Sequence, residues 1–121
     1  MERLTRARVK DCFKDEDTIY FVVAEGEMGK ALGKGGVNIK RVQNELGRRI
    51  KVIEYADNLV DFVRNIILPL KVAEIIDQNG TVIIRDDKKK TKSLLIGRGR
   101  KNLTLIKRAV SRFFNVEVVV E

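Results

Sequence analysis

The chain has 121 residues, with 25 Lys and Arg against 17 Asp and Glu, so its formal net charge is +8 at pH 7. This excess of positive charge favours a polyanionic partner, and nucleic acid is the usual one. A single cysteine and the absence of histidine exclude an intramolecular disulfide and a Cys/His zinc site and remove the commonest general base, so we expect neither an enzyme nor a cofactor.

The first elements in chain order are predicted to be a β-hairpin. Residues 7–13 and 18–24 are rich in β-branched, aromatic and other apolar side chains on either side of a polar turn. Cys12 lies in the first of these strands, and we expect it to be a buried structural thiol. A helix ahead of this hairpin would be too short to recognise.

Two helices and a strand are predicted to follow the hairpin. A short helix is expected at about 27–33, then a glycine loop, then a longer helix. The longer helix carries an apolar stripe at a helical spacing of three and four residues, which predicts one buried face. Residues 50–55 predict the closing strand. The stripe consists of Ile39, Val42, Leu46 and Ile50.

A separate amphipathic helix is predicted near residues 59–67, with Asp57 or Asn58 as its cap and Pro69 ending it. A second hairpin, 72–77 with 81–86, follows around Asn79–Gly80, two residues that tolerate positive φ.

The remaining elements of the second half repeat the order of the first. A short helix is expected at about 89–96, followed by another glycine loop and a longer helix. Residues 116–120 predict the last strand. The longer helix has its own apolar stripe, formed by Leu103, Ile106, Val110 and Phe113.

An internal repeat relates the two halves at a shift of 64 residues without gaps. ALGKGGVNIKRV, residues 31–42, aligns with LIGRGRKNLTLI, residues 95–106, and matched apolar positions continue on both sides. A repeat of this kind indicates a duplicated small domain. We therefore predict α+β architecture in two domains, 1–56 and 57–121, each a three-stranded sheet packed against helices.

The glycine loops are the candidate ligand sites. GKGG, residues 33–36, separates two predicted helices, so glycine backbone, a lysine and the N–H groups of the next helix would face a phosphate together. An ordinary tight turn between helices would need one glycine. Met28 and Gly35 break the pattern of a nucleoside-triphosphate loop.

Basic residues gather around both loops. Residues 28–51 contain seven Lys or Arg and one acid, and residues 88–112 contain ten and no acid. A charge run of this kind also suits a merely solvated face. Asn38 and Asn102 are candidates to donate to phosphate or base, although polarity at a helix start explains them equally well. The candidate nucleic-acid-binding residues are Gly33, Lys34, Gly35, Gly36, Asn38, Lys40, Arg41, Gly97, Arg98, Gly99, Arg100, Lys101, Asn102 and Lys107.

The order helix, G-x-x-G, helix, strand resembles the KH domain, whose loop clamps about four nucleotides of a single strand. The stretches that carry the resemblance are VKDC (9–12), the segment 21–42, VIEYADN (52–58) and IGRGRKNLTL (96–105). With two strands first, each copy resembles the type II KH arrangement, and the pair is similar to the tandem KH domains of archaeal NusA-like transcription factors. The resemblance implies single-stranded RNA as partner, with an RNA polymerase elongation complex as a further candidate, and a role in transcription elongation or termination.

The second loop departs from the family pattern, because Arg100 stands where the last glycine belongs. The arginine either hinders close approach of the backbone or itself contacts phosphate. A KH factor in ribosome assembly or RNA turnover, and a protein adaptor without RNA binding, are the alternative functions.

We expect a cytoplasmic protein that does not associate with a membrane and has no small-molecule substrate. No apolar run approaches the roughly 20 residues that span a bilayer, and the first residues lack the apolar stretch of a signal peptide.

Overall fold

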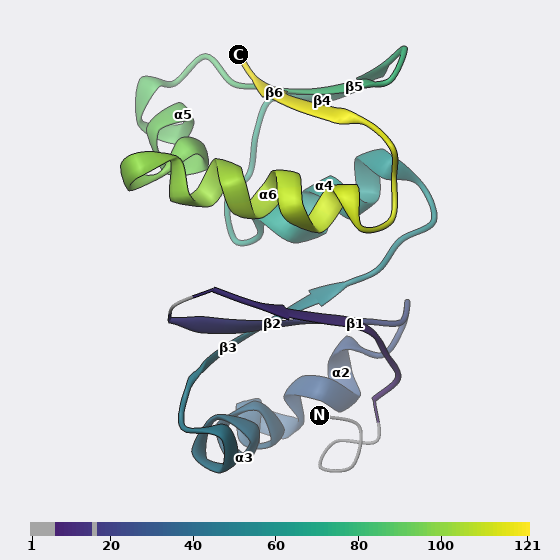
Figure 1. Cartoon of the computed structure of the whole chain (residues 1–121), viewed down its shortest axis with the longest axis vertical. Coiled ribbons are helices and arrows are strands. Elements are labelled where there is room, and N and C mark those ends of the chain that lie inside the picture. Colours follow the sequence, from purple (N-terminus) through teal and green to yellow (C-terminus); the bar gives the residue numbers. More distant parts are fainter. Residues whose placement is uncertain (1–6, 16) are drawn as a thin grey trace. The chain divides into compact units, whose positions relative to one another are not determined.

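The computed structural model describes residues 7–15 and 17–121 and divides into two compact units. The first extends to Ala56, and the second comprises Asp57–Glu121. Each has one three-stranded sheet with helices against it (Figure 1), so the predicted α+β class is confirmed. Any helix ahead of the first hairpin would lie in residues 1–6, outside the described residues.

The first unit contains a sheet of order β1-β2-β3, in which β1 runs antiparallel to β2 and β3 runs parallel to it. Helices α2 and α3 lie on one face of this sheet (Figure 1). A single 3₁₀ turn, Lys34–Gly36, joins the two helices. The elements are β1 (Val9–Lys14), β2 (Thr18–Val23), α2 (Met28–Leu32), α3 (Val37–Leu46) and β3 (Arg49–Glu54).

The short helix α2 packs against the central strand β2. Its last four residues, Tyr20–Val23, are all buried, as befits a TIYFVV strand between two others. Val23 forms a buried cluster with Ala31 of α2 and with Ala7. Small side chains at this contact let the helix backbone lie close to the sheet.

The polar turn between β1 and β2 is organised by Asp15. Its Oδ1 accepts hydrogen bonds from the backbone N–H groups of Asp17 and Thr18, both at 2.9 Å. Its Oδ2 accepts from the hydroxyl of Tyr20 at 2.8 Å. Burial, reinforced by this hydrogen bond, raises the pKa of Tyr20 to about 12. The predicted hairpin is thus confirmed, with its turn held by a side chain.

The second unit repeats the arrangement, with sheet order β4-β5-β6, an antiparallel first pair and a parallel second pair. Helices α4, α5 and α6 lie on the same side of this sheet (Figure 1). The elements are α4 (Leu59–Ile67), β4 (Glu74–Gln78), β5 (Thr81–Arg85), α5 (Lys89–Ile96), a 3₁₀ turn (Arg98–Arg100), α6 (Lys101–Ser111) and β6 (Glu117–Val120).

Helix α4 has the predicted cap and the predicted buried face. Asn58, one of two candidate caps, accepts the backbone N–H of Asp61 through its Oδ1 at 2.8 Å. The helix ends at Ile67, ahead of Pro69. Phe62 is fully buried and its ring lies 5.4 Å from that of Phe113, just beyond α6. Aromatic packing therefore fixes α4 against the end of α6.

Two predictions about burial are wrong. Cys12 is exposed, because β1 is an edge strand in which Phe13 points inward and its neighbours point outward. Leu46, the third member of the first apolar stripe, is 44% exposed because α3 ends there and Gly47 turns the chain away, whereas Val42 is fully buried.

Within the described ranges, no helix is long and apolar enough to cross a membrane. No group of three or more His, Cys, Asp or Glu side chains there lies as a metal site requires.

Candidate nucleic-acid interface

The first glycine loop joins the end of α2 to the start of α3 through three residues with positive φ. Gly33 has φ 72° and ψ 171°, a combination that is almost confined to glycine. Gly35 and Gly36 have φ 64° and 76° with ψ near 20°, which is the left-handed helical region. Lys34 lies between Gly33 and Gly35 in the chain, and its side chain is exposed. The loop therefore presents backbone and one cation at the N-terminus of α3.

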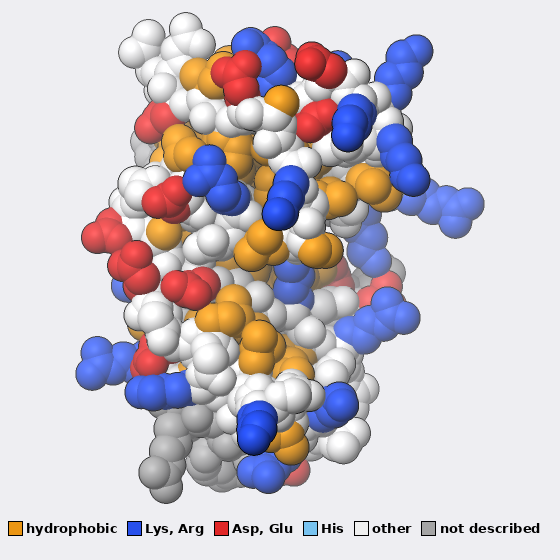
Figure 2. Space-filling model, turned by 180° about the vertical axis from the view of Figure 1, so that it is seen from behind, with side chains coloured by type: hydrophobic (Ala, Val, Ile, Leu, Met, Phe, Trp, Pro, Cys, Tyr) orange, Lys and Arg blue, Asp and Glu red, His pale blue; other side chains and the backbone are white. Residues whose placement is uncertain are grey.

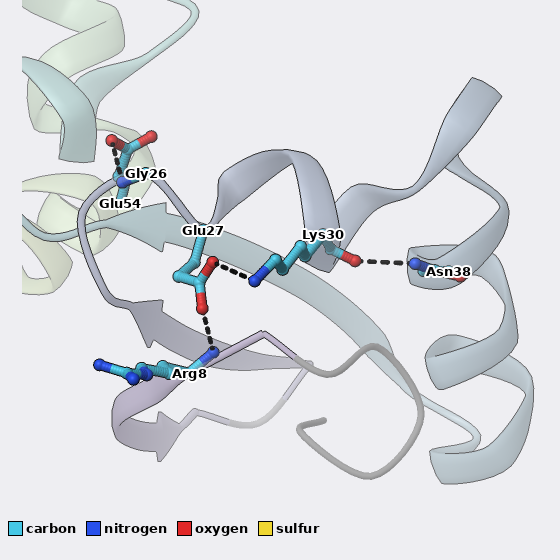
Figure 3. A network of polar contacts seen from close by, with 6 residues as sticks. All are labelled: Arg8, Gly26, Glu27, Lys30, Asn38 and Glu54. Atoms are coloured by element: carbon cyan, nitrogen blue, oxygen red, sulfur yellow. Dashed lines mark hydrogen bonds and ion pairs between the residues drawn. The ribbon is translucent and has the colours of Figure 1, made fainter.

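Asn38 locks this loop from inside α3. Its side-chain Nδ2 donates to the backbone oxygen of Lys30, eight residues earlier, at 2.7 Å (Figure 3). A Cβ atom on residue 33 would lie 2.7 Å from Asn38 Cγ and 3.0 Å from its backbone nitrogen. Glycine at 33 and asparagine at 38 thus form one interlocked pair, which gives Asn38 a positioning role.

A carboxylate continues this network towards the sheet. Glu27 accepts the backbone N–H of Arg8 through Oε1 at 3.2 Å, and its Oε2 lies 3.2 Å from Lys30 Nζ (Figure 3). The hydrogen bond from Lys30 lowers the pKa of Glu27, with a further contribution from Arg8. Helix α2 is thereby tied at one end to the segment before β1 and at the other to the loop.

The second loop has the same backbone conformation. Gly97 has φ 76° and ψ 170°, and Gly99 has φ 63° and ψ 24°. Arg100, in the place of Gly36, has φ 63° and ψ 21°. The Nδ2 of Asn102 donates to the backbone oxygen of Leu94 at 2.7 Å, matching Asn38. The predicted repeat therefore extends to the geometry of the loops. Arg100 has the left-handed backbone conformation that Gly36 has in the first loop.

We expect Arg100→Gly to raise the free energy of unfolding by about 1 kcal/mol, because a side chain with a Cβ is disfavoured in the left-handed region. Urea unfolding followed by circular dichroism measures the change. The reciprocal Gly36→Arg provides the control and should destabilise by a similar amount, since a Cβ there meets only Ile39 Cγ2, at 3.7 Å. A loss of stability in Arg100→Gly would contradict this interpretation.

The candidate cations gather near the two loops. Lys34, Lys40 and Arg41 are exposed at the first loop and along the start of α3. In Figure 2, Lys and Arg side chains project at the upper right, the side of the second unit on which α5 lies. The exposed cations at the second loop are Arg98, Arg100 and Lys101.

Lys107 lies apart from the loop. It lines an open groove of about 470 Å³ between α6 and β6, whose other lining residues are Thr104, Arg108, Ser111, Val116, Glu117 and Val118. Lys107 was a candidate from the sequence, and its neighbour Arg108, in the same acid-free run, was not.

Exposed apolar side chains beside the loops were also missed. Leu32 and Val37, which bracket the first loop, are 37% and 48% exposed, and Leu94 is 45% exposed before the second. Val37 lies outside the apolar stripe of its helix, so the sequence already indicated that its side chain is away from the buried face.

The sequence model of the KH-domain family matches residues 1–75, more than half of the chain. The chain belongs to the KH-domain family. The matched residues include the first glycine loop and end before the second. The second loop is related to the family through the internal repeat and through the relatives that align over the full chain.

This KH-domain chain is similar over its length to archaeal NusA-like proteins, and it is one of them. A relative from Thermoplasma acidophilum, named probable transcription termination protein NusA, is 35% identical over 98% of this chain and 84% of its own length. One from Methanococcus vannielii, with the same name, is 40% identical over 61% of this chain. The match spans only 43% of that relative's length.

A solved structure supports the same relationship. The crystal structure of APE1850 has a TM-score of 0.77 to this chain at 34% identity, covering 98% of this chain and 90% of the other.

Proposed function

We propose that this KH-domain chain is a non-enzymatic, single-stranded RNA-binding protein made of two tandem type II KH domains, acting in transcription elongation or termination. Both units have the strand, strand, helix, loop, helix, strand order. The observation that carries the proposal is the recurrence of one glycine-loop geometry at the start of two helices, each with exposed cations. The role in transcription rests on the names of its relatives.

The geometry suits an extended single strand. Loop N–H groups and the N-terminal end of each longer helix attract phosphate oxygens, and the neighbouring lysines and arginines supply charge. The apolar side chains of Leu32 and Val37 offer surface for bases. Aromatic residues make up 6% of the chain, so base stacking on an aromatic platform contributes little to this binding mode.

The test is the double variant Lys34→Asp with Gly35→Asp, assayed by fluorescence anisotropy on labelled single-stranded RNA. We expect at least about a tenfold loss of affinity, because two negative charges would face the phosphates. The control is Lys34→Gln with Gly35→Asn, which imposes similar backbone strain without negative charge, since Asn and Asp both tolerate the left-handed region. Equal affinity of the wild type and the Asp variant would contradict binding at this loop.

The partner is tested separately. An RNA polymerase elongation complex is the proposed partner, and co-purification with polymerase supports it. Co-purification with ribosome precursors in place of polymerase would assign the chain to ribosome assembly.

A further inference from the structure

We propose that the two loops hold RNA by different forces: the second loop is a charge-driven phosphate clamp, and the first combines phosphate contact with apolar contact to bases or ribose. The inference rests on the proposed RNA binding. It assigns roles to Arg100 and Lys101 in the second loop and to Leu32 and Val37 beside the first.

The backbone cannot be the source of the difference. At each of the three positive-φ positions, the φ and ψ angles of the two loops differ by no more than 13°. The asparagine lock is also the same, with 2.7 Å hydrogen bonds from Asn38 and from Asn102. Any difference in how the loops hold a ligand must therefore come from their side chains.

The first loop exposes apolar surface. It has one cation, Lys34, and Leu32 and Val37 stand exposed at its two ends. Phosphate held at the loop would place the neighbouring sugar and base within reach of these side chains. Contact of this kind is hydrophobic, and its strength changes little with salt.

The second loop carries more charge and less apolar surface than the first, and Leu94, which is 45% exposed, is the apolar side chain that remains exposed beside it. Arg100 takes the place of Gly36, and Lys101 takes the place of Val37. With Arg98, three cations occur within four residues, all exposed, in a run from residue 88 to 112 that has no acid. Arginine binds phosphate through a planar pair of N–H donors, so Arg100 adds a geometric contact as well as a charge.

The two forces differ in salt dependence. Each phosphate neutralised on a single strand contributes about 0.7 to the slope of log affinity against log salt. Arg100 and Lys101 together should contribute about 1.4 to the slope, which corresponds to about a sevenfold difference between 50 and 200 mM salt.

The decisive variant is Arg100→Gly with Lys101→Val, which gives the second loop the side chains of the first at these two positions. Affinity for a labelled, mixed-sequence single-stranded RNA is measured by anisotropy across a salt series. We expect the slope to become shallower by about 1.4. The control, Lys88→Gln with Lys90→Gln, removes the same charge from the same unit outside the loop and should change the slope by less than half as much.

A first-loop variant tests the apolar contact. Val37→Ser should lower affinity about fivefold at low and high salt alike, because it removes hydrophobic contact and no charge. If the second-loop variant changes the slope no more than its control, or if Val37→Ser leaves affinity intact, the division of roles is wrong while RNA binding stands. If the wild type binds no single-stranded RNA, the proposed function itself is wrong.

Discussion

Gly33→Ala is expected to lower the free energy of unfolding by about 3 kcal/mol, the largest effect of any single change in the first loop. The residue combines φ 72° with ψ 171°, a conformation that side chains with a Cβ avoid at a cost of roughly 1–3 kcal/mol. The added Cβ would also lie 3.0 Å from the backbone nitrogen of Asn38, which no rotamer change relieves. Urea unfolding measures the loss.

Gly35→Ala is the control for that prediction at a second positive-φ position, where ψ is 19°. Gly35 also has positive φ, at 64°, but a Cβ there meets nothing within 4 Å. We expect a cost of about 1 kcal/mol, from conformation alone. The second loop supplies an independent pair, because Gly97 has the close contact, with Asn102 at 2.9 Å, and Gly99 has open space. Equal costs for the crowded and open positions would show that the asparagine does not select glycine at 33 and 97.

The order of elements could be read from local patterns because each has a local cause. Asn79–Gly80 predicts the second hairpin, and both residues have positive φ, 45° and 82°. Asn58 predicts the start of α4 through its cap, and the alternation of β5 places Val82 and Ile84 inside. Each of these signals depends only on neighbouring residues in the sequence and not on tertiary contacts.

The role of the loop asparagines could not be read in this way. Asn38 bonds to a carbonyl eight residues earlier, and it reaches that carbonyl only because the chain reverses at Gly33. From spacing alone, a polar residue at a helix start serves equally as a ligand or as a structural donor. The three-dimensional path of the loop decides between these roles, and sequence periodicity carries no information on it.

Arg100 shows a different limit of sequence reasoning. Glycine is the usual residue in a left-handed conformation, yet Arg100 adopts that conformation in the second loop. Gly97 and the Asn102–Leu94 hydrogen bond hold the loop on both sides, so the strained conformation persists with a side chain in it. The sequence shows that an arginine replaces the glycine. It does not show the contacts that keep the loop in the same conformation despite the conformational cost of a Cβ atom.

The second large effect is expected for Asp86→Ala, which should lower the free energy of unfolding by about 3 kcal/mol. Asp86 is 8% exposed and lies at the end of β5. Its Oδ2 accepts the backbone N–H of Ala73 at 3.0 Å, and its Oδ1 accepts that of Lys88 at 2.8 Å. One carboxylate thus joins the segment before β4 to the start of α5. Removing it leaves two partly buried N–H groups without this acceptor.

In the first unit a different carboxylate accepts the backbone N–H of the segment before the first strand. There Glu27 accepts the backbone N–H of Arg8, at a position not related to Asp86 by the 64-residue shift. Asp86→Asn keeps the shape and one acceptor oxygen, so we expect about half the loss of the alanine variant. Asp87→Ala, at an exposed neighbour, should change stability by less than about 0.5 kcal/mol. If Asp86→Ala and Asp87→Ala lowered the free energy of unfolding equally, the two hydrogen bonds of the Asp86 carboxylate would contribute nothing measurable to stability.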